Sequence, residues 1–196
     1  MEMLKLKNKI EFAVLNEPEI RDFALARNKI LEHSKSDWIF FIDSDEIIPK
    51  KLYEELKSLN LGGYTGFYVW RDNYFLGRFI GRDKILRLGR RGFGSWYRKV
   101  HEEWGLKGRK GELKNHIFHE TAKSLKEYIY KLNLYSTLHA EANTLEGKKA
   151  NLFKIIFYPK IKFFQSVIGG RGVVFSILQS FHSFLSWSKL WLSQKK

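Results

Sequence analysis

The sequence predicts an α/β fold, and three consecutive features support this prediction. Residues 38–42 form an apolar run of aromatic and β-branched side chains, which indicates a buried strand of a largely parallel sheet. Three carboxylates, Asp43, Asp45 and Glu46, follow it, and residues 49–59, which begin with proline, then show helical spacing. This order places Asp43 and Asp45 at the carboxyl end of a strand, where open α/β sheets bind their ligands.

The acidic pair supports two interpretations. Asp43 and Asp45 alternate in an extended turn, so they could present oxygen ligands to a hard divalent ion that also holds phosphate oxygens. The turn could equally be a helix start, because Ser and Asp are common N-caps and Glu suits a helix N-terminus. The Asp-x-Asp pattern alone does not decide, but the strand before it and the surrounding chain favour the metal site.

The composition indicates one folded domain, with room for an appendage. The chain has 196 residues, of which 44% are hydrophobic and 16% aromatic, and this excludes wholesale disorder. It contains no cysteine, which excludes disulfides, thiolate metal sites and cysteine nucleophiles, and which fits the cytosol. Residues 1–5 lack the apolar core of a signal peptide.

The net charge of +14 is concentrated in two regions. Residues 71–114 hold thirteen Lys and Arg against five acids, and residues 144–196 hold nine against one. Two basic regions indicate anionic partners, which could be nucleic acid, the phosphates of a sugar nucleotide, or membrane lipid. Scattered lysines that only make the surface soluble are the alternative.

Two elements are predicted ahead of the central strand. Residues 9–15 could form a short strand. Asn16-Glu17-Pro18 signals a helix start, and residues 18–34 carry apolar side chains near one helical face. Arg27 and Asn28 lie in this helix, where spacing alone favours an ordinary surface pair.

Two further strands are predicted after the helix of residues 49–59. Residues 66–70 alternate in the manner of a strand, and residues 84–88 form another. We expect residues 71–78 to be a polar, aromatic loop. Residues 90–98 combine Gly, Arg and aromatic side chains, which suggests a mobile basic segment that could close over a phosphate.

Candidate acid–base groups follow. His101, Glu102 and Glu103 could supply a general base, with an exposed turn as the alternative. His116 and His119 flank a predicted strand, and their spacing of three places them on opposite faces of it. One of the two could be a ligand, although a lone histidine is more often structural.

The C-terminal part is predicted to be helical and basic. A Ser-x-x-Glu capping box at Ser124 starts a helix that should end near Asn143, and residues 146–149 form a hinge. Residues 151–168 mix aromatic and β-branched side chains with lysines, and glycines at 169–172 interrupt them.

Residues 172–188 carry no Asp, Glu, Lys or Arg, yet they are too short and too rich in serine for a comfortable membrane span. Basic flanks together with Trp187 and Trp191 favour a helix that lies on an anionic membrane surface. A dimer interface and a helix packed on the domain are the alternatives.

An ordered series of short motifs resembles family 2 glycosyltransferases of the GT-A fold, in particular the branch of lipopolysaccharide core glucosyltransferase-like enzymes. The series is Asp22-Phe23-Ala24 with Ala26-Arg27-Asn28, Asp37-Trp38-Ile39 with Asp43-Ser44-Asp45-Glu46, Arg71-Asp72-Asn73-Tyr74-Phe75-Leu76-Gly77, Leu86-Arg87-Leu88, Val100-His101-Glu102, His119, and Tyr128-Ile129-Tyr130-Lys131-Leu132-Asn133. It covers most of residues 20–145. No single motif is decisive, and the order of the series makes the likeness specific.

The resemblance implies an inverting transfer of a sugar from a nucleotide-diphosphate donor to an acceptor hydroxyl on a cell-surface glycan or glycolipid of the lipopolysaccharide core type. By position, Asp43, Asp45 and His119 would hold Mg²⁺ or Mn²⁺ against the diphosphate. Glu102, or less directly Glu103, would take the proton of the acceptor hydroxyl.

The resemblance also implies that Arg27, Asn28 and Asp43 lie near the donor nucleotide. Arg87, with Arg90 and Arg91 close by in sequence, could neutralise phosphates, and this inference rests on charge and position rather than on the family.

The expected architecture is a truncated GT-A (Rossmann-like) sheet flanked by helices in residues 1–145, followed by an amphipathic helical tail in residues 146–196. The family begins with strands and a helix that cradle the base, and we expect nothing ahead of Asn16 to match them. We expect a cytoplasmic protein that is peripheral at the inner face of the cell membrane.

Two other function classes remain open. A basic module that binds nucleic acid would fit the charge and the arginines interleaved with aromatics, but neither the acidic strand end nor the uncharged aromatic tail suits it, so no nucleic-acid partner is predicted. A catalytically weak or inactive relative could instead act as a membrane-surface or assembly protein.

Overall fold

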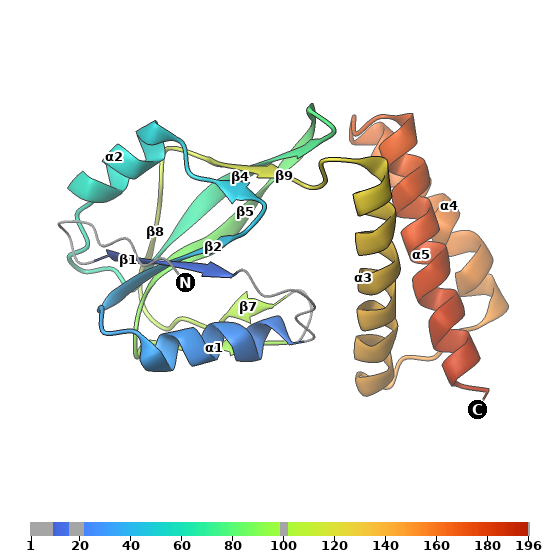
Figure 1. Ribbon diagram of the computed structural model, residues 1–196. Helices are drawn as coiled ribbons and strands as arrows, with labels where there is room; N and C mark the ends of the chain where they lie inside the picture. The colour runs from blue at the N-terminus through green and yellow to red at the C-terminus, as the bar shows by residue number, and fades with distance from the viewer. Residues whose placement is uncertain (1–9, 16–21, 99–101, 196) are drawn as a thin grey trace. The chain divides into compact units, whose positions relative to one another are not determined.

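The computed structural model describes residues 10–15, 22–98 and 102–195 (Figure 1). The chain divides into two compact units, Met1–Asn73 with Arg82–His119, and Tyr74–Gly81 with Glu120–Lys196. Helices flank a sheet in the first unit, and the second is mainly helical. The α/β fold class predicted from the sequence is confirmed.

One mixed sheet forms the centre of the first unit. In chain order the elements are β1 (Ile10–Leu15), α1 (Phe23–His33), β2 (Trp38–Asp43), β3 (Glu46–Ile47), α2 (Lys50–Ser58), β4 (Gly66–Phe75), β5 (Arg78–Arg90), β6 (Trp96–Tyr97), β7 (Glu103–Trp104), β8 (Lys110–Glu112) and β9 (Ile117–Glu120). The sheet has the order β1-β2-β5-β4-β9-β3, and β8 also pairs with β4. β1 runs parallel to β2 and β8 to β4, whereas β5 is antiparallel to β2 and β9 to β3.

The alternation of β2 builds a core on each face of the sheet. Trp38 and Phe40 pack into one cluster with Leu52 and Leu56 of α2. Ile39 and Phe41 point to the other face, where the second cluster includes residues of α1. Figure 1 shows α1 and α2 on opposite sides of the sheet. Because both faces are covered, β2 is apolar throughout, and its first polar residue, Asp43, comes where the strand ends.

The structure corrects two expectations from the sequence. Asp22 is extended and its side chain accepts a hydrogen bond from the Leu25 amide, so α1 begins at Phe23 and not at residue 18. Residues 71–78 are not a loop, because β4 and β5 form a long hairpin around a two-residue turn at Leu76 and Gly77. Both turn residues have positive φ, of 48° and 74°, as a type I′ turn requires.

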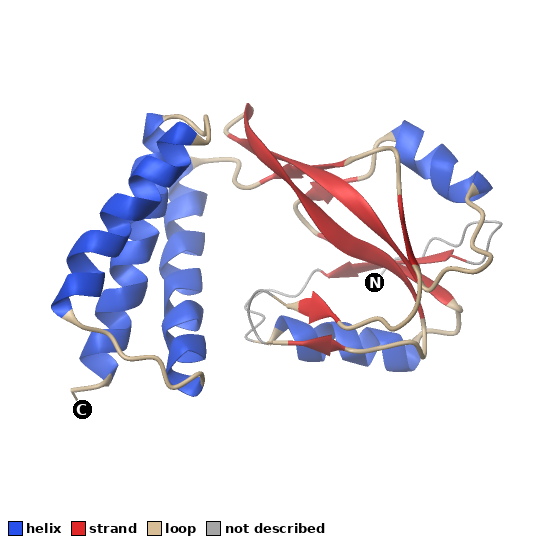
Figure 2. Cartoon of the chain, turned by 180° about the vertical axis from the view of Figure 1, so that it is seen from behind, coloured by secondary structure: helices blue, strands red, loops and turns tan. Residues whose placement is uncertain are grey.

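Three helices make up most of the second unit: α3 (Leu125–Leu145), α4 (Leu152–Ile168) and α5 (Val173–Ser193). The capping box predicted at Ser124 is present, since its side chain accepts a hydrogen bond from the Glu127 amide. α5 packs against both α3 and α4, and the three helices lie together in Figure 2. No helix among the described residues is long and apolar enough to cross a membrane.

Candidate active site

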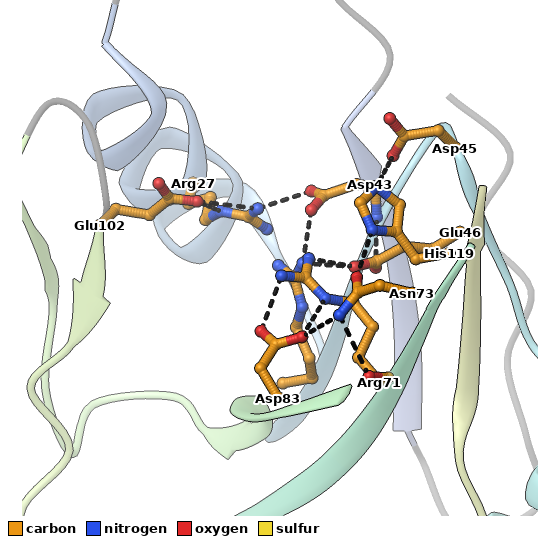
Figure 3. A network of polar contacts seen from close by, with 10 residues as sticks. Arg27, Asp43, Asp45, Glu46, Arg71, Asn73, Asp83, Glu102 and His119 are labelled. Atoms are coloured by element: carbon orange, nitrogen blue, oxygen red, sulfur yellow. Dashed lines mark hydrogen bonds and ion pairs between the residues drawn. The ribbon is translucent and has the colours of Figure 1, made fainter. Parts of the chain in front are cut away.

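Arg27 is a buried cation at one end of a polar network (Figure 3). Its side chain is 1% exposed, and its Nη2 lies 2.6 Å from Asp43 Oδ1 and 3.1 Å from Glu102 Oε1. The guanidinium also lies over the rings of Trp96 and Phe41, 4.7 Å and 5.4 Å from their centroids. Two carboxylates and two aromatic faces thus compensate for the loss of solvation of this charge. The side chain is not part of a surface pair.

Arg87 holds the other side of Asp43. Its Nη2 donates to Asp43 Oδ2 and, at 2.7 Å, to Glu46 Oε1, while Glu46 Oε2 accepts from the Asp43 amide at 3.0 Å. Burial alone would raise the pKa of Asp43, but the charges of Arg87 and Arg27 outweigh it and hold this pKa well below its usual range. The Asp43 carboxylate is therefore ionised, and each of its two oxygens accepts a hydrogen bond from an arginine.

A second arm of the network runs from Glu46 to His119. Arg71 Nη1 lies 3.0 Å from Glu46 Oε1, and Arg71 also binds both oxygens of Asp83, at 2.8 Å and 3.2 Å. Asn73 donates from Nδ2 to Asp83 at 2.6 Å, which turns its Oδ1 toward His119 Nδ1 at 2.7 Å. His119 must donate from Nδ1 to this oxygen, so the lone pair of a neutral His119 ring is on Nε2.

His119 and Asp45 form the far end of the network in Figure 3, where His119 Nε2 is 3.5 Å from Asp45 Oδ1. The Asp45 carboxylate fits Mg²⁺ or Mn²⁺, ions that often use few protein ligands beside water and substrate phosphates, and the His119 nitrogen suits the softer Mn²⁺ better than Mg²⁺. Among the described residues, no three His, Cys, Asp or Glu converge as metal ligands. Each Asp43 oxygen accepts from one arginine, so a second lone pair on the same oxygen could still bind a metal.

The charges of the network leave an excess of acid. It contains the carboxylates of Asp43, Asp45, Glu46, Asp83 and Glu102 and the guanidinium groups of Arg27, Arg71 and Arg87. With His119 neutral, the carboxylates exceed the guanidinium groups by two, which one divalent cation would balance. Arg27 Nη1 and Arg87 Nε are buried N–H groups for which the described part of the chain provides no acceptor.

Asn28 supports the network through the main chain. Its Nδ2 donates to the Trp96 carbonyl and its Oδ1 accepts from the Trp96 amide, both at 2.8 Å. Trp96 in turn stacks on Trp104, with ring centroids 5.0 Å apart. Asn28 therefore holds the tryptophan that lies against Arg27, and its amide is occupied by protein.

The structure brings Arg27, Asp43, Arg87 and Glu102 into direct contact, and places Asp45 and His119 at the end of the same network. The other basic and acidic candidates lie apart from it. Arg90 is exposed with its guanidinium over Phe93, Arg91 is exposed, and Glu103 is exposed and binds Tyr97 and Arg98. His101 lies outside the described residues. His116 and His119 contact Asp72 and Asn73, so they lie on opposite faces as predicted.

Sequence reasoning missed Glu46, Arg71, Asn73 and Asp83 as site residues. The sequence predicts Glu46 only as part of an acidic turn, and Arg71 and Asn73 only as part of a loop. Arg71 and Asn73 are two residues apart, so recognising this stretch as a strand would have placed their side chains on one face of it. Nothing in the sequence near Asp83 connects it with Arg71.

Comparisons with known proteins agree with this architecture. A family model described as glycosyl transferase family 2 matches residues 2–130. The lipopolysaccharide core biosynthesis glycosyltransferase LpsC of Rhizobium meliloti is 30% identical over 188 residues, which cover 87% of this chain and 70% of the relative. An uncharacterized glycosyltransferase of Rickettsia conorii is 26% identical over 181 residues, covering 79% of this chain and 64% of the relative.

The comparisons also correct one expectation. The family match begins at residue 2 and not at Asn16, and it includes β1, which pairs in parallel with β2 over its whole length. The segment ahead of Asn16 is therefore part of the likeness.

Proposed function

The chain belongs to glycosyl transferase family 2, and on this premise we propose that it moves a sugar from a nucleotide-diphosphate donor to an acceptor hydroxyl with inversion at the anomeric carbon. The observation that carries the proposal is the position of Glu102 beside the Arg27–Asp43–Arg87 cluster. This arrangement places a carboxylate that can accept a proton beside buried cations that can stabilise an anionic leaving group.

Glu102 is the proposed general base. Its carboxylate takes the proton of the acceptor hydroxyl as the acceptor oxygen bonds to the anomeric carbon and the bond from that carbon to the diphosphate oxygen breaks. The electron pair of that bond leaves with the diphosphate. Glu102 is 18% exposed in its side chain, so it is reachable from solvent while it is held by Arg27.

The donor diphosphate is proposed to bind where the network has unused hydrogen-bonding capacity. Arg27 Nη1 and Arg87 Nε are buried donors for which a ligand oxygen would be an acceptor. Asp45 and His119 are the groups that would hold Mg²⁺ or Mn²⁺, which would offset negative charge on the leaving group when bound. Two roles stay predictions of the resemblance. One is contact of Asn28 with the donor, and the other is direct contact of Asp43 with the donor or the metal.

The acceptor is proposed to be a cell-surface glycan or glycolipid of the lipopolysaccharide core type, a suggestion supported by the name of the Rhizobium relative. Residues 1–145 would carry the transfer, and residues 146–196 would hold the protein on the anionic inner face of the cell membrane. The basic charge of this segment supports such peripheral binding. Nucleic acid is not a proposed partner.

Isothermal titration of UDP and UDP-glucose in the presence of Mn²⁺ tests the proposal. Wild type is compared with Asp45→Ala and with Asp37→Ala, which removes an exposed aspartate outside the network. Binding by wild type and Asp37→Ala that is lost in Asp45→Ala is the expected result. If folded wild type binds neither ligand nor other sugar nucleotides, and turns none over, the donor site is wrong and a non-catalytic membrane or assembly role takes its place.

A further inference from the structure

Polar side chains make several of the contacts between the helices of the second unit. Between α5 and α3, Gln179 Nε2 donates to the hydroxyl of Tyr128 at 2.7 Å. Farther along, Lys189 Nζ lies 2.7–2.8 Å from oxygens of Asn133, Ser136 and Thr137. Between α5 and α4, the Ser176 and Ser166 hydroxyls are 2.9 Å apart, and both serines are buried.

Large apolar side chains of α4 and α5 point away from these contacts. Those that are exposed by more than two fifths are Leu152, Phe153, Ile156, Phe157, Ile161, Phe164 and Ile168 on α4, and Val173, Val174, Ile177, Phe181, Phe184 and Leu192 on α5. On each helix several of them recur every three or four residues, which gives a continuous apolar stripe. The buried positions of the pair include Ser166, Ser176, Ser183 and Ser186.

This distribution is the reverse of that in a water-soluble helix pair. Such a pair buries its large apolar residues and exposes its serines. Of the large aliphatic and aromatic side chains in residues 152–193, only Phe175 and Leu190 are buried, and Phe175 clusters with Phe75 and Ile80 at one end of α5. Small residues between helices and large apolar residues outside are typical of helices that pack in lipid.

The charge around the stripes favours an anionic membrane as the surface that covers them. No Asp or Glu follows Glu146 in the sequence, whereas lysines flank the aromatic residues of both helices. The Lys154 ammonium lies 4.9 Å from the centroid of the Trp187 ring, and that of Lys195 lies 3.6 Å from the centroid of Trp191. A second copy would bring the same positive charge to the contact, but anionic lipid headgroups would neutralise it.

We propose that α4 and α5 insert their exposed apolar stripes into one leaflet of an anionic membrane and lie along its plane. This rests on the proposed membrane association and goes beyond it, because contact with acyl chains and not only charge would hold the protein. An in-plane position agrees with the finding that no described helix could cross a membrane. The lysines would then reach the headgroups from the boundary of the apolar layer.

Vesicle flotation of the full chain tests insertion. The vesicles contain phosphatidylcholine with phosphatidylglycerol, and binding is measured in low salt and in about 1 M salt, where the Debye length is only about 3 Å. Insertion predicts that most of the binding survives high salt. Phe164→Ala and Phe181→Ala should each weaken it roughly tenfold, whereas Phe93→Ala, an exposed phenylalanine of the first unit, should not.

A second measurement does not depend on loss of binding. Tryptophan is placed at the same positions (Phe164→Trp and Phe93→Trp), and quenching by lipids with brominated acyl chains is compared with wild type. Added quenching in Phe164→Trp alone is expected.

Each other outcome overturns insertion in a distinguishable way. Binding that disappears in high salt, without added quenching, leaves peripheral association intact. Failure to bind any vesicle removes both membrane proposals and leaves the transfer reaction untouched. A dimer by light scattering that loses affinity in Phe164→Ala would assign the stripes to a second copy.

Discussion

Glu102 and Arg27 are 75 residues apart in sequence, yet Glu102 Oε1 lies 3.2 Å from Arg27 Nε and 3.1 Å from Arg27 Nη2. The same Nη2 binds Asp43 at the end of β2. One buried guanidinium therefore fixes the position of the proposed base relative to the acidic strand end. Glu103, its exposed neighbour, is not held in this way, so substitutions of the two glutamates can distinguish their roles.

Glu102→Gln is expected to reduce the rate of sugar transfer by about 10²–10⁴-fold, because the amide cannot take the acceptor proton. Glu103→Gln is the matched control, since Glu103 is exposed and binds Tyr97 and Arg98, which lie outside the network. Donor affinity measured by titration should stay within a few-fold of wild type in both variants. If Glu103→Gln lost most of its transfer rate while Glu102→Gln stayed active, the general base would be Glu103 and not Glu102.

Asp43→Asn should lower the free energy of unfolding at neutral pH by about 3 kcal/mol, because it leaves two buried arginines short of a charged partner. The pKa of Asp43 is lower in the folded chain than the unfolded value of about 3.9. Its stabilisation is therefore complete above the unfolded pKa and is lost as the pH falls toward the folded pKa.

Denaturant unfolding of wild type and Asp43→Asn between neutral and acid pH measures this effect. The difference between the two proteins should shrink as the pH falls below about 4. Asp37→Asn, at an exposed position, serves as the control. A difference that stays constant down to the acid limit would show that the Asp43 charge does not supply the stabilisation.

Asn73→Ala should weaken Mn²⁺ binding about 10–100-fold without removing either proposed ligand. The change deletes the oxygen that accepts from His119 Nδ1, so the ring is no longer held with Nε2 toward Asp45. Nitrogen chemical shifts of His119 should then show a mixture of tautomers, in place of the form protonated at Nδ1. Asn60→Ala, at an exposed turn, should change neither measurement, and unchanged shifts in Asn73→Ala would argue against a positioning role.

Gly89→Ala should destabilise the first unit by about 1–3 kcal/mol, because a Cβ at this position would lie 2.4 Å from Cη2 of Trp104. Trp104 stacks on the tryptophan that Asn28 holds against Arg27, so the strain would reach the site. Thermal unfolding gives the loss of stability, and near-UV circular dichroism reports on the tryptophan pair. An unchanged midpoint and spectrum would mean that the packing at Trp104 adjusts freely.

The centre of the fold and the acidic end of β2 could be predicted from local patterns. The run Trp38–Asp43 alternates between two apolar clusters and ends in carboxylates, so its burial on both faces and its functional end are properties of consecutive residues. The same holds for the Ser124 cap of α3 and for the helical tail with its glycine break. Short-range hydrogen bonds and side-chain periodicity determine these features, and both are visible in sequence.

The tertiary structure alone decided which charges meet. In a strict two-residue hairpin Arg71 would face Arg82, but its partner is Asp83, and Gly81, with φ of 125°, is the place in β5 where one extra residue can be accommodated. A shift of one residue changes which side chains share a face, and no local pattern in this stretch specified it. Likewise, composition revealed an aromatic, basic tail, but only the packing of α3, α4 and α5 showed that four serines of α4 and α5 are buried while most of their phenylalanines are exposed. Contacts between residues far apart in the chain determine both, because their partners are chosen by the folded geometry.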